Sequence, residues 1–212
     1  MTAAKKRTTK KAAAKKRAAR KARAELPQRL FKRPADWAAW LAKNHAKSPG
    51  LWLQLAKKES GVQSVTYPEA VEAALCWGWI DGQAKRYDEK TWLQKFTPRG
   101  PRSIWSQINR DKALALIGAG QMQPAGLAAV ERAKQNGQWD AAYASQKNSS
   151  VPADLQAALD TNPQAQAFFA TLNSVNRYAI TFRLQTAKKP ETRARRLEQF
   201  LRMLANGEKL YP

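Results

Sequence analysis

Apolar positions along the first third of the chain change from a helical period to a strand period. In RPADWAAWLAKNHAK the two tryptophans and the following leucine recur at i, i+3 and i+4, which predicts an amphipathic helix that ends before Pro49-Gly50. In LWLQLAKK three leucines then alternate with other residues, which is typical of a strand. The chain therefore begins its folded part, near Leu26, with a helix followed by a strand.

A second helix and a hairpin are predicted next. TYPEAVEAALCWGW opens with Thr66 and has Glu69 three residues later, a capping-box pattern that starts a helix. Two short strands, Ile80–Tyr87 and Thr91–Thr97, can fold back on each other around DEK. Together with the leucine strand, they predict a small antiparallel sheet.

The rest of the chain has helical patterns with short breaks. After the loop TPRGPR, Ser103 is expected to cap a helix whose apolar face consists of Ile104, Ile108, Leu114 and Ile117. Further helices are predicted in PAGLAAVERAKQNG, VPADLQAALDTNP, PQAQAFFATLN, SVNRYAITFRLQTA and KPETRARRLEQFLRMLANG. The expected fold class is α+β and predominantly helical, with a small antiparallel β-sheet or hairpin and several packed helices.

The charge of the chain is unusually positive and unevenly distributed. Lys and Arg number 38 against 16 Asp and Glu, which gives +22, and residues 1–25 hold eleven of the cations with one acid. This segment has no large apolar residue after Met1, so we expect a disordered Lys/Arg/Ala-rich tail over 1–25. Residues 26–212 are expected to form a single globular domain, with a sub-boundary near 145–152 as an alternative.

Such a tail predicts a polyanionic partner. The expected nonspecific nucleic-acid contacts are Lys5, Lys6, Arg7, Lys10, Lys11, Lys15, Lys16, Arg17, Arg20, Lys21 and Arg23. DNA, RNA and anionic lipid are all compatible with this composition, although the tail offers no aromatic or leucine face for insertion into a membrane.

The remaining composition narrows the compartment and the chemistry. The single cysteine, Cys76, excludes an internal disulfide, and no stretch of about 20 apolar residues is present to span a bilayer. We expect a cytoplasmic protein, with association to the nucleoid as an option. With His45 as the only histidine and without GxGxxG, GxxxxGK[ST] or CxxC, no metal site and no cofactor are predicted.

A loop that enters a helix offers the best site for a small anion. Arg99 and Arg102 precede Ser103 and Ser106, and a helix N-terminus combined with arginine forks suits phosphate or carboxylate. The structural alternative is that the serine caps the helix while the arginines are solvated or pair with an acid such as Asp81.

Asp81 itself has two readings. Near tryptophans its carboxyl could be desolvated and act as a general acid, whereas Asp-Gly is also a common turn pair and could form an ion pair with Arg86 or Arg99. Trp105 and Trp92 can stack on a base or sugar, or they can belong to the core.

Four motifs stand in one order along the chain: YPEAVEAALCWGWIDG, FTPRGPRSIWSQIN, GQMQPAGLAAVERAKQNGQWDAAY and AKKPETRARRLEQFLRML. Together they resemble the YdeI/OmpD-associated, or bacteriocin-protection, family over Leu30 to Gly207. The resemblance implies a role in bacterial resistance to antimicrobial peptides and in envelope stress, and it implies no catalytic residue. The candidate ligand set combines some of the positions that match with arginines near the expected anion site, and it consists of Trp79, Asp81, Arg86, Arg99, Arg102, Ser103, Trp105, Ser106, Asn109, Arg193 and Arg196.

The predicted function is therefore cytoplasmic protection against stress or bacteriocins by binding, with a nucleic-acid-binding tail. Two alternatives stay open. One is an enzyme that acts on a small anionic substrate in a pocket built from Asp81, Arg99 and Arg102, and the other is a module for anionic membrane surfaces. A protein partner in place of a small ligand is equally compatible with the sequence.

Overall fold

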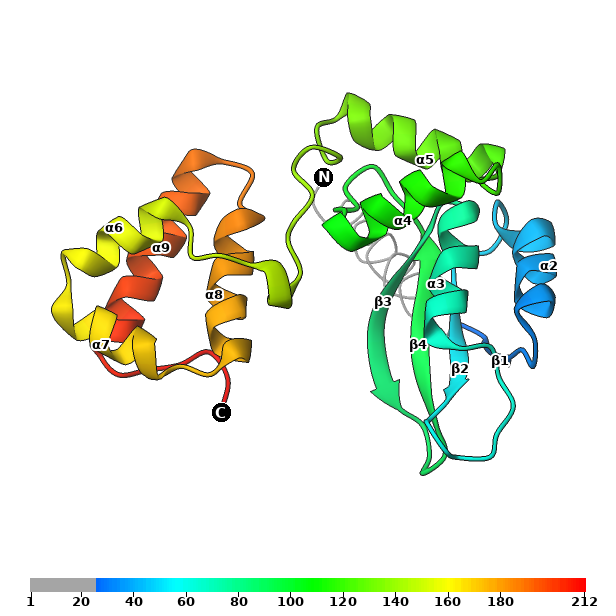
Figure 1. Cartoon of the computed structure of the whole chain (residues 1–212), viewed down its shortest axis with the longest axis horizontal. Coiled ribbons are helices and arrows are strands. Elements are labelled where there is room, and N and C mark those ends of the chain that lie inside the picture. Colours follow the sequence, from blue (N-terminus) through cyan, green and yellow to red (C-terminus); the bar gives the residue numbers. More distant parts are fainter. Residues whose placement is uncertain (1–25) are drawn as a thin grey trace, which may run out of the picture. The chain divides into compact units, whose positions relative to one another are not determined.

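The computed structural model describes residues 26–212, and within them it contains eight α-helices and a four-stranded sheet. The predicted α+β, mainly helical fold class is thus confirmed (Figure 1). The predicted basic tail at 1–25 lies outside the described residues. None of the described helices is long and apolar enough to cross a membrane.

Two compact units make up the described chain. One combines the sequence up to Arg102 with Ala113–Arg132, and the other combines Ser103–Lys112 with Ala133–Pro212. Helix α4 (Gln107–Gly118) runs across this division. The expectation of a single domain over 26–212 stays a prediction, and each unit is described by itself below.

The first unit is built on a sheet with the strand order β1-β2-β4-β3. β2 pairs antiparallel with β4, and β4 pairs antiparallel with β3, as the alternating leucines and the DEK hairpin predict. β1 pairs parallel with β2 at the edge, a strand that the sequence analysis did not predict. The strands are Gln28–Leu30 (β1), Leu51–Ala56 (β2), Trp79–Arg86 (β3) and Thr91–Pro98 (β4).

Helices α2 (Pro34–Asn44) and α3 (Tyr67–Cys76) pack on one face of this sheet (Figure 1). The ring of Trp37 in α2 lies 5.6 Å from the ring of Phe96 in β4, and its Nε1 donates to the Ala70 carbonyl of α3 at 3.1 Å. Residues that face each other across an antiparallel pair point to the same side of the sheet. The leucines of β2 therefore share the side of Phe96, and they are buried there.

The start of α3 has the contacts that the capping-box pattern predicts. The Glu69 carboxylate accepts from the Thr66 backbone N–H at 2.8 Å and from the Thr66 hydroxyl at 2.7 Å. The hydrogen bond from the Thr66 side chain is the main cause that lowers the pKa of Glu69 below its ordinary value. A local sequence signal therefore fixes where this helix begins.

Helix α5 (Pro124–Gln135) packs closely on the end of α3 because a glycine faces it. A Cβ at Gly126 would lie 2.3 Å from the Cys76 carbonyl oxygen, closer than side-chain atoms approach a carbonyl. A side chain at this position would therefore push the two helices apart.

Helix α4 corrects two predictions. It begins at Gln107, and the Ser106 hydroxyl, not that of Ser103, accepts the backbone N–H of Asn109 at 3.1 Å. Its predicted apolar face is not buried either: Ile108, Leu114 and Ile117 are 48%, 51% and 36% exposed. The nine positions from Ile108 to Ile117 correspond to roughly two and a half turns at 3.6 residues per turn. The side chains of Ile108 and Ile117 therefore point in opposite directions.

The second unit ends in four helices around a core of their own (Figure 1). A short 3-10 turn at Gln146–Asn148 precedes them. The helices are Ala153–Asp160 (α6), Pro163–Thr171 (α7), Ser174–Gln185 (α8) and Pro190–Ala205 (α9). Their core consists of Leu155, Leu159, Ala165, Phe169, Leu172, Ile180, Leu184, Phe200 and Leu204. The predicted helix in KPETRARRLEQFLRMLANG is present, and Gly207 follows it with φ +70°.

Candidate functional site

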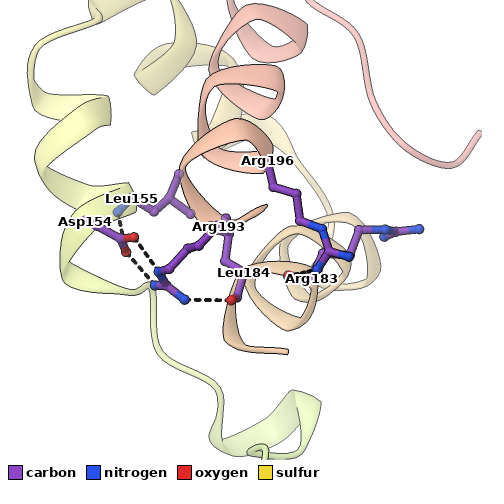
Figure 2. A network of polar contacts seen from close by, with 6 residues as sticks. All are labelled: Asp154, Leu155, Arg183, Leu184, Arg193 and Arg196. Atoms are coloured by element: carbon purple, nitrogen blue, oxygen red, sulfur yellow. Dashed lines mark hydrogen bonds and ion pairs between the residues drawn. The ribbon is translucent and has the colours of Figure 1, made fainter. Parts of the chain in front are cut away.

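Arg193, predicted as an anion ligand, lies at the centre of a polar network in the second unit (Figure 2). Its Nε and Nη2 donate to the two carboxylate oxygens of Asp154, each at 2.7 Å, so the fork of the guanidinium pairs with the carboxylate in a bidentate way. Its Nη1 donates to the Leu184 carbonyl at 2.6 Å. One side chain of α9 thereby joins α6 to the end of α8.

Arg196, one turn further along α9, reaches the same end of α8. Its Nη1 donates to the Arg183 carbonyl at 2.5 Å, next to the Leu184 carbonyl that accepts from Arg193 (Figure 2). The last carbonyls of a helix have no partner within the helix and lie at the negative end of its dipole. Two guanidinium groups therefore place positive charge at the C-terminus of α8 and donate to two of its last carbonyls, of which that of Leu184 also accepts from the Ala187 N–H.

The electrostatics of the pair follow from these contacts. The hydrogen bond from Arg193 is the main cause that lowers the pKa of Asp154, and it outweighs burial, which acts in the opposite direction. The same contact raises the pKa of Arg193. Both groups are consequently charged over the whole physiological pH range.

The donors of Arg193 are thus directed to groups of the protein. The geometry gives this residue a positioning role in the C-terminal helices, because it holds α6, α8 and α9 together. An anion could reach Arg193 only in competition with Asp154, a carboxylate already seated in bidentate geometry. Its assignment as an anion ligand stays a prediction.

Asp81 is a strand residue, not a turn residue. It lies in β3 opposite Phe96, beside an irregularity in the pairing of β3 with β4. Its carboxylate accepts from the Tyr67 hydroxyl at 2.8 Å, and the Tyr67 ring packs 5.8 Å from that of Trp92. The prediction of a turn at Asp81 is therefore wrong, and its partner Tyr67 was not predicted from the sequence.

The arginines of the TPRGPR loop differ in exposure. Arg99 is buried, with 6% of its surface exposed, and its backbone N–H donates to the Gly78 carbonyl at 2.9 Å. Arg102 is exposed, and so is Arg86 at the end of β3. Trp79 is buried in the core of the same unit and donates from Nε1 to the His45 carbonyl at 3.2 Å.

The other predicted ligands belong to the second unit. Trp105 is buried and its ring lies 4.9 Å from that of Trp139, so it belongs to the core. Ser103, Ser106 and Asn109 are half-buried, and the last two share the helix-cap hydrogen bond of α4. The predicted ligand set is therefore distributed over both units, and a groove between the Arg99–Arg102 loop and α9 stays a prediction.

A cleft that the sequence did not indicate lies in the first unit, beside α2 and α3. It has a volume of about 420 Å³, and its polar lining comes from Glu72, Cys76, Gln121 and Gln123, with Trp77 as the aromatic wall. Burial raises the pKa of the Cys76 thiol, which keeps it protonated and disfavours a nucleophilic role. Within residues 26–212 no three His, Cys, Asp or Glu side chains gather as metal ligands.

Comparison with known proteins divides the chain in a similar way. Residues 29–129 match a family model described as Domain of unknown function (DUF8412), which covers the first two of the four motifs that carry the resemblance. No curated protein and no solved structure matches the chain. Residues 148–207 match the family model described as Bacteriocin-protection, YdeI or OmpD-Associated, and they include the Asp154–Arg193 network and the last motif. The predicted family likeness is therefore confirmed for this C-terminal part, which is shorter than the predicted range Leu30–Gly207.

Proposed function

We propose that the protein protects bacteria against bacteriocins or related antimicrobial peptides by binding, and that its basic N-terminal segment holds it on nucleic acid in the cytoplasm. The match of residues 148–207 is the observation that carries the protective role, since it suggests a function related to bacteriocin protection. The matched residues fold into helices whose arginines Arg193 and Arg196 donate to acceptors of the protein itself.

The nucleic-acid part of the proposal is supported by the density of charge in residues 1–25. Eleven cations and one acid in 25 residues neutralise phosphates without reading a base sequence. Residues 26–212 hold the other 27 cations, so the folded part adds to the attraction for polyanions. The absence of large apolar residues after Met1 favours nucleic acid over a membrane surface as the partner of this segment.

The experiment compares the full chain with a variant in which the eleven Lys and Arg residues of 1–25 are replaced by Gln. Binding to a fluorescent DNA duplex is measured at several salt concentrations. For the natural chain, log affinity should fall with log salt by about 0.9 for each phosphate neutralised, and the slope should become much shallower in the variant. Equal affinity and equal slope for both proteins would remove the segment from nucleic-acid binding.

Two further measurements test the remaining parts of the proposal. Co-sedimentation with anionic vesicles should be weak at physiological salt, and vesicle binding as strong as duplex binding would favour the membrane-surface alternative. Survival of a sensitive bacterial strain under antimicrobial-peptide challenge should rise when the protein is expressed. Unchanged survival would argue against the protective role.

A further inference from the structure

The face of the sheet opposite to α2 and α3 carries an aromatic side chain among cations. Because strand residues alternate, Trp52 of β2 points away from the face that holds its buried leucine neighbours. Lys95 of β4 lies directly opposite Trp52 and shares its side of the sheet. The tryptophan is half-buried, so part of its ring remains accessible.

A second cation covers the ring itself. The ammonium of Lys85, which extends from β3, lies 4.3 Å from the centroid of the Trp52 ring. Lys85 pairs with Leu93 on β4, and Leu93 is only 1% exposed although no buried leucine of β2 shares its side. One ammonium therefore lies over the indole, and a second lysine occupies the position directly opposite it on the neighbouring strand.

The charged strand residues next to Trp52 on this face are cations, whereas the Asp88 carboxylate lies at the hairpin end, where it accepts from the Thr91 hydroxyl at 2.8 Å. The strand residues that share the side of Trp52 include Gln54, Lys85, Lys95 and Thr97, and the carboxylate of β3, Asp81, lies on the other side, opposite Phe96. A ligand seated here would meet an aromatic surface flanked by positive charge and amides. A polymer that has regularly spaced negative charges and planar rings that can stack is complementary to this face.

We infer that this face binds single-stranded nucleic acid, with a base stacked on Trp52 and phosphates paired with Lys85 and Lys95. A duplex keeps its bases stacked inside, so an indole on a flat sheet can reach a base only when the strand is single. The cation–π contact of Lys85 at an exposed position is weaker than a base stack, so an incoming base displaces the ammonium, which then lies beside the phosphate. The inference concerns the folded unit and holds whether or not residues 1–25 bind nucleic acid.

The test uses the full chain, a labelled single-stranded oligonucleotide and a duplex of the same sequence. Trp52→Leu keeps an apolar side chain at this position and removes the aromatic ring. It should weaken single-strand binding about tenfold and leave duplex binding unchanged, whereas Trp52→Phe should retain most of the single-strand affinity. Single-strand affinity of Trp52→Leu equal to that of the natural chain, or an equal loss for the duplex, would overturn the inference.

The lysines give a second, independent readout in variants that keep the core intact. Lys85→Gln should reduce the salt slope for the single strand by about 0.7, the value for one phosphate, and Lys43→Gln on exposed α2 should not change it. An unchanged slope in Lys85→Gln would contradict the proposed phosphate contact. Tighter binding of polyglutamate than of the oligonucleotide, in the variant with the eleven N-terminal cations replaced by Gln, would identify an acidic peptide as the ligand class and also overturn the inference.

Combined variants separate the contribution of residues 1–25 to binding from that of the sheet face. If the effect of Trp52→Leu persists when the eleven N-terminal cations are replaced by Gln, the sheet face acts independently of the segment. If the effect is present only when those cations are intact, the face has no affinity of its own and the inference fails. Failure of the proposed function therefore appears in the duplex measurements, and failure of this inference appears in the single-strand measurements.

Discussion

Replacement of Arg193 by Leu should destabilise the C-terminal helices while leaving their fold recognisable. The substitution removes two hydrogen bonds of 2.7 Å to Asp154 and one of 2.6 Å to the Leu184 carbonyl. The Asp154 carboxylate keeps the Leu155 N–H and the Leu184 carbonyl keeps the Ala187 N–H, but both lose the guanidinium. The effect belongs to a single side chain that joins three helices, so its magnitude can be worked out from the contacts.

Exposure decides how large that magnitude is. The side chains of Arg193 and Asp154 are 31% and 37% exposed, so solvent screens the ion pair and its value falls between that of a buried charged bond and that of a surface pair. We assign about 1 kcal/mol to the pair and about 1 kcal/mol to the bond with the Leu184 carbonyl, which gives a loss of about 2 kcal/mol in the free energy of unfolding. Arg195→Leu, at an exposed position on the same helix, is the matched control and should change this free energy by less than about 0.5 kcal/mol.

Far-UV circular dichroism and hydrogen exchange are suitable probes, because all eight tryptophans precede residue 140 and fluorescence does not report on these helices. A double-mutant cycle of Arg193→Leu with Asp154→Asn should give a coupling energy of about 1 kcal/mol. Hydrogen exchange should become faster at the start of α6 and the end of α8. A coupling energy of zero within error, or Arg193→Leu as stable as Arg195→Leu, would refute the reasoning.

The pH dependence of the same pair has a definite sign. The pKa of Asp154 is lower in the folded protein than its ordinary value of 3.8, so the unfolded chain binds the proton more readily. The stabilisation is fully present above pH 3.8 and is lost as the pH falls through the folded-state pKa. The difference in stability between the natural chain and Arg193→Leu should therefore shrink below pH 3.8, and a constant difference would contradict the assignment.

Two further substitutions test the packing and capping of the helices. Gly126→Ala should destabilise the first unit by about 1–3 kcal/mol, because its Cβ would meet the Cys76 carbonyl at 2.3 Å. Gly118→Ala is the control and should be neutral or stabilising, because a Cβ there would have no atom within 4 Å. Equal thermal unfolding midpoints for the two variants would disprove the close contact. Asn162→Ala removes the side-chain acceptor of the Ala165 N–H, a bond of 3.1 Å at the start of α7, and should cost about 1 kcal/mol in chemical denaturation, whereas an unchanged midpoint would show that the cap contributes nothing.

Local sequence signals predicted much of the fold. The capping box of Thr66 and Glu69, the alternating leucines of β2 and the DEK hairpin all act between residues close in sequence, and the structure contains each of them. The helices of the C-terminal part follow from apolar periodicity in the same way. β1 was missed because its three residues, QRL, are too few to show a period, and their pairing with β2 depends on distant residues.

The contacts of the polar groups could not be predicted to the same extent. The partner of Arg193 is an aspartate 39 residues away, and no local pattern selects Asp154 from the other acids. The exposed side chains of α4 were assigned to a core because Ile108, Leu114 and Ile117 are apolar, although their spacing does not follow one helical face. Trp52 could have been found, because its place between two buried leucines already predicts that it points to the other side of the sheet.

The central claim is that the protein protects by binding while the charge of residues 1–25 holds it on nucleic acid. It is tested most directly by survival of a sensitive strain under antimicrobial-peptide challenge. Cells are compared that express the natural chain, the variant with the eleven cations replaced by Gln, or Arg195→Leu, at equal protein levels. We predict that the natural chain and Arg195→Leu protect equally and that the neutralised variant loses most of the protection. Full protection by the neutralised variant would contradict the claim.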